Sequence, residues 1–306
     1  MMKKFLCALI FVALMSSICS ASDVVDAGML AYLGTTEAEF QEGLDDLRKV
    51  LAPLVPADSP EYDEDDWRDY STLEIFFSAL LKDRRIVHFY DSLLSMQMAL
   101  RSKKLDEITL PEIVGMYLIS NNPKYEILFS LNMMPSTISF GFKKGNTALQ
   151  KEFNTAIAAM KKDGTLKKLE EKYLSEHSSI SERVEFQNFK GANTIKVAVT
   201  GDLPPIDYIA ADGTPTGYNT AILSEIGKHL KKNIRLISVD SGGRSAALAS
   251  ERADVVFWYR NTEGLKTPKK LQGKNLKGVM KDSLDGVILS DPYYEWDTDL
   301  IIGLAQ

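Results

Sequence analysis

The stretch NTIKVAVTGDLPPIDYIAADGTPTGYNTAILSEIGKHL, residues 193–230, decides the fold. It begins with a short apolar strand pattern at 195–199 and passes through a loop rich in proline, glycine and aspartate. It ends in a helical pattern over 218–231. A strand, a turn and a helix in this order form the opening unit of an α/β lobe. The same rhythm continues with strands predicted at 234–239 and 253–258 and a helix between them at 245–252.

Residues 140–174 have the pattern that closes an α/β lobe rather than the pattern that opens one. Their sequence is FGFKKGNTALQKEFNTAIAAMKKDGTLKKLEEKYL. It reads as a return strand followed by two helices, the first opened by the capping-box spacing of Thr147 and Gln150. The two stretches are therefore complementary halves in reversed order. Other strands are predicted at 29–33, 85–89, 108–110, 125–131 and 137–142, and other helices at 37–50 and 92–101.

The first residues have the pattern of a secretory signal peptide. Lys3 and Lys4 precede an apolar run at 5–15, and small residues end at Ala21. We expect residues 1–21 to be cleaved, with a lipid anchor at Cys19 as the less favoured alternative. The two cysteines of the chain, at positions 7 and 19, both lie here. The mature chain is then expected to contain no disulfide and no thiolate metal site.

The charge of the chain argues against nucleic acid as a partner. Loss of Lys3 and Lys4 takes the formal net charge from −6 to −8, whereas phosphate binding needs a basic face. The acid is concentrated at residues 61–69, inside a proline-rich insertion at about 51–71. A solvated loop is the favoured interpretation, and a metal or partner site is the alternative. The run has no EF-hand pattern, and we predict no metal and no cofactor.

Five short segments share a pattern with a known family. They are GDLPP at 201–205 with GY at 217–218, RADVV at 252–256, SDPYY at 290–294 and GTT at 34–36. In these the chain resembles the bacterial extracellular solute-binding proteins of family 3, the polar amino acid binders of ABC importers. The likeness covers most of residues 28–36, 84–178 and 193–306. It implies an α/β, two-lobed periplasmic-binding-protein-like (type II) fold.

The order of the lobes departs from that family, in which lobe one comes first. Here the resemblance implies lobe two at 24–135 and lobe one at 136–178 and 193–306, with a linker at 179–192. The simplest interpretation is a circularly permuted fold, because termini that lie close together tolerate permutation. The rival interpretation is a piece of a tandem-repeat protein completed by another chain. We expect residues 298–304 to pair antiparallel with 137–142 as two hinge strands, of which only the second joins the lobes covalently.

The resemblance also implies a ligand site between the lobes. Gly34, Thr35 and Thr36 open a helix whose free N–H groups suit a carboxylate. An ordinary helix cap is the alternative. The arginine that usually complements this turn is best matched by Arg260, with Arg244 as a weaker candidate.

The partner for an ammonium group is less well matched. The family's aspartate corresponds to Pro111, so Glu112 is the nearest substitute, although it also suits a first helical turn. Asp202 is expected to face the cleft or to serve the turn. Tyr208 and Trp258 are candidate aromatic walls. Tyr293 is more consistent with the core.

The resemblance implies an exported, monomeric protein that captures a small polar solute outside the cytoplasmic membrane and delivers it to the membrane subunits of an ABC importer. The alternatives are a sensory or interaction module that has lost transport and a cyclohexadienyl-dehydratase-like enzyme on the same fold. No catalytic motif supports an enzyme. The three histidines, at positions 88, 177 and 229, are scattered, and there is no GxSxG sequence.

Overall fold

The computed structural model describes residues 25–30, 37–38, 41–42, 45, 49, 85–175, 183–210, 212–240, 243–261 and 286–305. Side chains are not described for residues 25, 29, 30, 85, 131–136, 245, 258–261 and 297. The predicted signal peptide at 1–21, including Cys19, and the acidic insertion at 51–71 lie outside the described residues.

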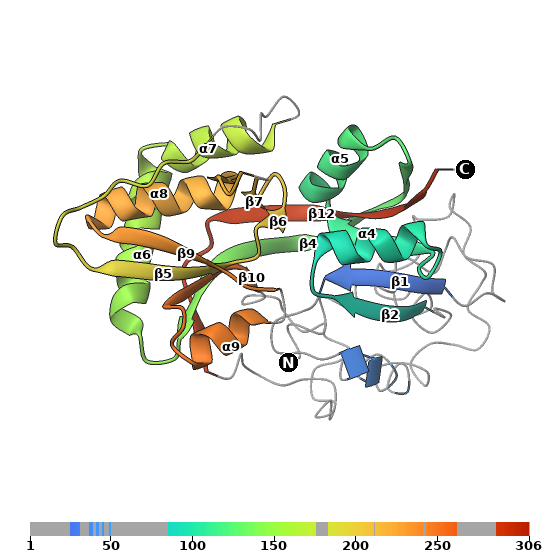
Figure 1. Ribbon diagram of the computed structural model, residues 1–306, viewed down its shortest axis with the longest axis horizontal. Helices are drawn as coiled ribbons and strands as arrows, with labels where there is room; N and C mark the ends of the chain where they lie inside the picture. The colour runs from blue at the N-terminus through green and yellow to red at the C-terminus, as the bar shows by residue number, and fades with distance from the viewer. Residues whose placement is uncertain are drawn as a thin grey trace, which may run out of the picture.

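The described strands and helices alternate in the way that an α/β fold requires (Figure 1). The strands are β1 (Val25–Leu30), β2 (Arg85–Tyr90), β3 (Glu107–Pro111), β4 (Tyr125–Lys143), β5 (Thr194–Val199), β6 (Asp202–Leu203), β7 (Asp207–Ile209), β8 (Pro215–Thr216), β9 (Asn233–Ser238), β10 (Val255–Asn261), β11 (Val287–Leu289) and β12 (Tyr294–Leu304). The helices are α4 (Leu93–Arg101), α5 (Glu112–Asn121), α6 (Thr147–Lys162), α7 (Thr165–Leu174), α8 (Tyr218–Leu230) and α9 (Gly243–Ala249).

Most strands belong to one mixed sheet with the order β2-β1-β3-β12-β4-β10-β5-β9, and β11 also pairs with β4. Lobe two lies on one side, where β1, β2 and β3 are accompanied by α4 and α5 (Figure 1). Lobe one lies on the other side, with β5, β9, β10 and α6 to α9. The expected union of the two complementary halves is confirmed, because β10 pairs with β4 on one edge and with β5 on the other.

Strands β4 and β12 form a long antiparallel ribbon that runs through both lobes (Figure 1). The predicted register of this ribbon is wrong. Residues 298–304 pair with 125–132, whereas Ile138 pairs with Tyr294. The reason is that β4 continues without a break through 132–136, so the later half of β12 meets the lobe-two half of β4. Because β12 also pairs with β3, both strands join the lobes covalently, and the expectation of a single connection is wrong as well.

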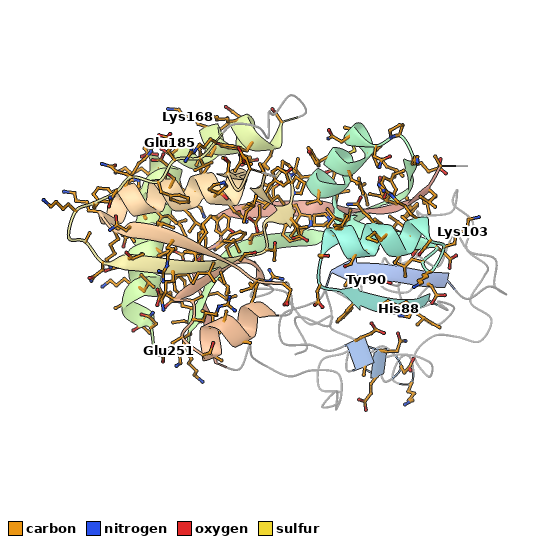
Figure 2. All side chains as sticks on the ribbon, in the orientation of Figure 1. His88, Tyr90, Lys103, Lys168, Glu185 and Glu251 are labelled. Atoms are coloured by element: carbon orange, nitrogen blue, oxygen red, sulfur yellow. The ribbon has the colours of Figure 1, made fainter. Side chains whose placement is uncertain are left out.

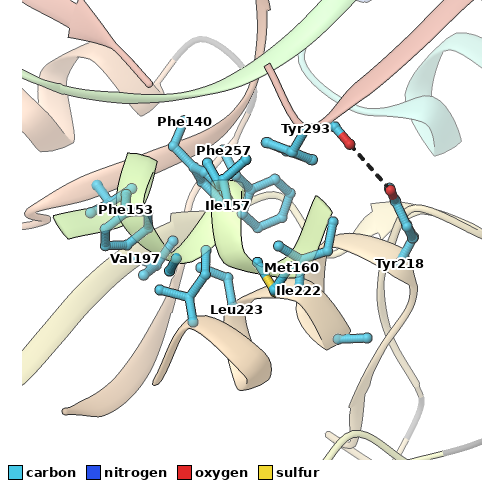
Figure 3. Packing of buried hydrophobic residues seen from close by; sticks show 14 of the residues in the cluster. Phe140, Phe153, Ile157, Met160, Val197, Tyr218, Ile222, Leu223, Phe257 and Tyr293 are labelled. Atoms are coloured by element: carbon cyan, nitrogen blue, oxygen red, sulfur yellow. Dashed lines mark hydrogen bonds between the residues drawn. The ribbon is translucent and has the colours of Figure 1, made fainter. Parts of the chain in front are cut away.

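The core of lobe one is built from aromatic rings and helix faces (Figure 3). Phe140 and Phe142 of β4 each meet Phe153 of α6 edge to face, with ring centroids 5.2 and 5.1 Å apart. Tyr293 stacks on Phe140 with centroids 4.5 Å apart, which agrees with its predicted place in the core. Each fully buried side chain of this size contributes about 1.5–3 kcal/mol, so this cluster holds β4 firmly to lobe one.

Residues 183–192, within the predicted linker, pack along lobe one between α7 and β5. Val184 is buried in the lobe-one core, and its N–H donates to the Pro215 carbonyl at 3.1 Å. The amide of Asn233 accepts from the N–H of Phe189 at 2.8 Å and donates to the carbonyls of Phe189 and Ala192. This part of the segment is therefore attached to the lobe by side-chain hydrogen bonds even though it contains no helix or strand.

Candidate functional site

The two lobes meet where the loop after β5 lies against α4. This loop contains a small antiparallel sheet of β6, β7 and β8, in which Asp202 pairs with Tyr208. Leu203 and Ile206 belong to lobe one by sequence, yet they are buried in the lobe-two cluster that includes Leu93 and Met96. The seam between the lobes is thus apolar on one side of Asp202.

Asp202 itself reaches across this seam. Its Oδ2 accepts a hydrogen bond of 2.9 Å from the N–H of Leu93, the first residue of α4. Its Oδ1 is buried and has no hydrogen-bond partner among the described residues. The first turn of α4 carries no acidic residue of its own, and Ser92 caps the helix through the N–H of Ser95. The carboxylate from lobe one is therefore the anion at the positive end of the lobe-two helix.

A second carboxyl group, which sequence reasoning missed, shapes the loop that carries Asp202. Oδ2 of Asp207 accepts from the N–H and hydroxyl of Thr200, both at 2.9 Å, and from the N–H of Gly201 at 2.7 Å. Complete burial raises the pKa of Asp207 to about 6 despite these three donors, and the charge of Asp202 adds to the increase. Asp207 begins the three-residue strand β7, which is too short to show a period that would have marked it in the sequence.

The pKa of Tyr117 in α5 is raised first by burial and second by the nearby Tyr208 of β7. Glu112 is exposed in the first turn of α5, a position that fits the helix-dipole alternative, and no described hydrogen bond joins it to Asp202 or Tyr208. Of the predicted ligand residues, the structure brings Asp202 and Tyr208 together on one hairpin.

The other predicted residues are placed only in part. Gly34, Thr35 and Thr36 lie outside the described residues, although Glu37 after them is helical. Trp258 and Arg260 lie in β10, where the backbone of Arg260 is paired with Ile138. These assignments remain predictions.

Arg244, the weaker arginine candidate, has a described position. It is buried at the start of α9, and its Nη1 donates to the Phe257 carbonyl in β10 at 3.4 Å. Its guanidinium is therefore bonded to the backbone of lobe one, and its role toward a solute stays a prediction.

A shallow groove of about 430 Å³ opens beside α9 in lobe one. Its lining consists of Ser238, Val239, Asp240, Gly243, Ala246, Ala247, Ser250 and Arg252. None of the predicted ligand residues lines it, and it involves only one lobe. The seam around Asp202 is therefore the better candidate for a site that depends on both lobes.

Among the described residues, no group of His, Cys, Asp and Glu side chains has the arrangement of a metal site. Of the helices that the structure describes, none combines the length and apolarity needed to cross a bilayer.

Solved structures of low sequence identity resemble the chain only weakly. A zinc-bound ligand-binding component of an ABC-type import system from Staphylococcus aureus is 10% identical with a TM-score of 0.41; the match covers 92% of this chain and 66% of that chain, just under two thirds. A pheromone cOB1 precursor/lipoprotein of the YaeC family from Enterococcus faecalis is 12% identical with a TM-score of 0.39, covering 92% and 85%. A methionine-binding protein is 9% identical with a TM-score of 0.37, covering 92% and 83%.

Among curated protein sequences, none shows significant similarity to the chain. The model of one family, described as bacterial extracellular solute-binding proteins, family 3, matches residues 38–176 and 195–263. These ranges contain α4, α5, the loop with Asp202 and most of the two lobes, and together they exceed half of the 306 residues. The chain therefore belongs to the bacterial extracellular solute-binding proteins of family 3.

Proposed function

We propose that the protein captures a small polar solute, an amino acid or a related compound, in the cleft between its lobes and delivers it to an ABC importer. The single observation that carries this proposal is the carboxylate of Asp202. One of its oxygens is anchored to α4 of the opposite lobe, and the other is buried and has no hydrogen-bond partner among the described residues. A buried acceptor of this kind strongly favours a donor such as an ammonium group.

The same chemistry suggests which residues would bind the other groups of the solute. A two-lobed protein buries its solute on closing, so each charge of the solute needs a partner. The carboxylate of an amino acid would be held by the helix start at 34–36 and by Arg260 or Arg244. Tyr208 and Trp258 would form aromatic walls. The N–H of Phe89 donates a hydrogen bond of 2.7 Å to Oε2 of Glu37, which supports a fixed position for the helical residue that follows 34–36.

We further propose that the protein acts outside the cytoplasmic membrane after cleavage of residues 1–21, as a monomer and a circular permutant. Membership of an extracellular family supports the location. The permutation is supported by two features: the sheet shared by β4, β10 and β5, and the packing of residues 183–192 against lobe one between α7 and β5.

The test begins with the native protein purified under mild conditions. Mass spectrometry of the material released on unfolding is expected to identify a small zwitterionic or cationic compound. That compound should raise the melting temperature of the wild-type protein and should bind Asp202→Ala more weakly by tenfold or more, as expected for the loss of a buried charged partner. Unchanged affinity in Asp202→Ala would remove Asp202 from the site.

A turnover assay with the same compound separates binding from catalysis. Recovery of the compound unchanged supports capture and delivery. Formation of product would replace this proposal with an enzymatic one. Absence of any binding, with the compound and with a panel of amino acids, would support a sensory or interaction module instead.

A further inference from the structure

We propose that Asp207 is a positioning residue for solute binding, which acts on the solute through Asp202. The two residues lie on the paired strands β6 and β7, where Asp202 pairs with Tyr208 and Leu203 pairs with Asp207. Asp207 is 1% exposed, and its hydrogen bonds stay within its own loop. This role rests on the proposed function, because Asp202 is the residue assigned there to the solute.

The hydrogen bonds of Asp207 fix the two residues that directly precede Asp202. Its Oδ2 accepts from the N–H and the hydroxyl of Thr200 and from the N–H of Gly201, at 2.9, 2.9 and 2.7 Å. Gly201 has φ +74°, and its carbonyl accepts from the N–H of Ile209 at 2.9 Å. One buried carboxylate therefore sets the direction in which the backbone enters Asp202.

The charge of Asp207 strengthens this arrangement. Hydrogen bonds to an ionised carboxylate are stronger than those to a neutral acid, so protonation of Asp207 weakens all three at once. A negative charge close to Asp202 also attracts a cationic group of the solute to the same place. Both effects have the same direction, and the solute should bind more tightly when Asp207 is ionised.

Asp202 is the charged neighbour that influences the ionisation of Asp207. Complete burial raises the pKa of Asp207 to about 6 although three donors oppose the increase, and the charge of Asp202 raises it further. Strand β8 and helix α8 also pack against β7. β8 has no titratable side chain, and Tyr218 in the first turn of α8 stays neutral because burial raises its pKa. A cation bound at Asp202 should therefore favour loss of the Asp207 proton, and by linkage the solute should bind more tightly as the pH rises through about 6.

The first experiment tests the positioning contacts without any solute. The full chain is unfolded, dialysed and refolded, and its backbone amide NMR signals are followed from pH 5 to pH 7.5. The amide signals of Thr200 and Gly201 are expected to shift with a midpoint near pH 6, as Asp207 loses its proton. The transition should be absent in Asp207→Asn. Signals of Thr200 and Gly201 that do not shift in this range in the wild-type protein would overturn the proposal.

The second experiment measures binding by calorimetric titration at pH 5 and pH 7.5. The probe is the compound released from the native protein and identified by mass spectrometry. Wild type should bind it about fivefold or more tightly at pH 7.5 than at pH 5. Asp207→Asn resembles the neutral acid, so its affinity should be nearly the same at both pH values. Asp254→Asn is the matched control: Asp254 accepts the Lys196 N–H near the start of β5, and its loss should leave the wild-type pH dependence unchanged.

A double-mutant cycle at pH 7.5 distinguishes positioning from a general loss of stability. If Asp207 acts through Asp202, Asp207→Asn weakens binding in the wild-type background and causes no further loss in the Asp202→Ala background. Equal losses in both backgrounds would show that Asp207 only supports the fold, and would overturn the proposal. Wild-type affinity in Asp202→Ala would instead contradict the proposed function, and the amide signals would still decide whether Asp207 holds the loop. The two failures are therefore distinguishable.

Discussion

Nε2 of His88 lies 2.8 Å from Oδ1 of Asp26, which joins the neighbouring strands β2 and β1 through their side chains. On its other side, Nδ1 of His88 lies 3.3 Å from Oε1 of Glu37 (His88 in Figure 2). One imidazole therefore contacts two carboxylates, and one of these belongs to the helical residue that follows the predicted carboxylate-binding turn. Partial burial by itself lowers the pKa of His88, but the hydrogen bond to Asp26 and the charge of Glu37 outweigh it, so the pKa is raised.

The His88 contact predicts a pH dependence of stability. A raised pKa in the folded state means that protonated His88 stabilises the fold; this contribution is complete below the ordinary value of about 6.5 and is lost as the pH rises through the folded pKa. His88→Gln should flatten the fall in melting temperature as the pH rises above about 6.5. His229→Gln, at an exposed position of α8, is the matched control and should keep the wild-type slope. A wild-type slope in His88→Gln would contradict the prediction.

The raised pKa of Asp207 predicts a second pH dependence of stability, at lower pH. Its folded pKa of about 6 exceeds the ordinary value, so folding favours the protonated carboxyl. This contribution is present below about pH 4 and is lost as the pH rises towards 6, on the order of 3 kcal/mol in all. Asp207→Asn keeps an oxygen acceptor for Thr200 and Gly201 and removes the titration. Urea unfolding at pH 4, 5 and 6 should show the decline in wild type and its near absence in the variant.

We predict that Gly217→Ala and Gly213→Ala differ strongly in their effect on the free energy of unfolding. At φ +100°, a Cβ on Gly217 would lie 2.6 Å from the carbonyl oxygen of Ile206, which accepts from the first turn of α8. Gly217→Ala should cost more than about 2 kcal/mol, because strain and a backbone clash combine. Gly213 has φ +82° with no atom within 4 Å of an added Cβ, so Gly213→Ala should cost about 1 kcal/mol. Equal unfolding free energies for the two variants would show that the clash is relieved.

Arg244 of α9 and Arg260 of β10 are predicted to differ in role. Arg244→Gln should lower the free energy of unfolding by about 1–3 kcal/mol, because the Phe257 carbonyl loses a charged donor in a buried place. Arg260→Gln should weaken binding of the co-purified solute by roughly tenfold to a hundredfold. Calorimetric titration together with chemical unfolding distinguishes the two. The reverse outcome would identify Arg244 as the solute's partner.

Local patterns were sufficient for most strands and helices. The strand predicted at 195–199 and the helix at 218–231 correspond to β5 and α8, because alternation and helical spacing report burial directly. The pairing of the crossing strands was not predictable in the same way. Two strands were predicted at 125–131 and 137–142, but they form one continuous strand, β4, and the register of its partner differs from the prediction by several residues. Register depends on contacts between distant segments, which local periodicity does not contain.

The resemblance to a family led us to expect the segment that contains Asp202 near the cleft, but the contacts of that segment were not predictable. Its contact with Leu93 depends on a helix end 109 residues away and left no local signal. Asp207 escaped notice for a related reason: a carboxyl group that accepts only backbone and hydroxyl donors within its own loop has no charged partner to reveal it.

The ribbon of β4 and β12 has a consequence for how the molecule melts. Ile138 and Phe140 of β4 lie in the core of lobe one, and Tyr125 of the same strand lies in the core of lobe two. Leu300 and Ile302 of β12 complete the second core. If one lobe unfolds, the other lobe loses part of the strands that form its core. Heat denaturation should therefore appear as one cooperative calorimetric peak, with no stage in which a single half survives alone.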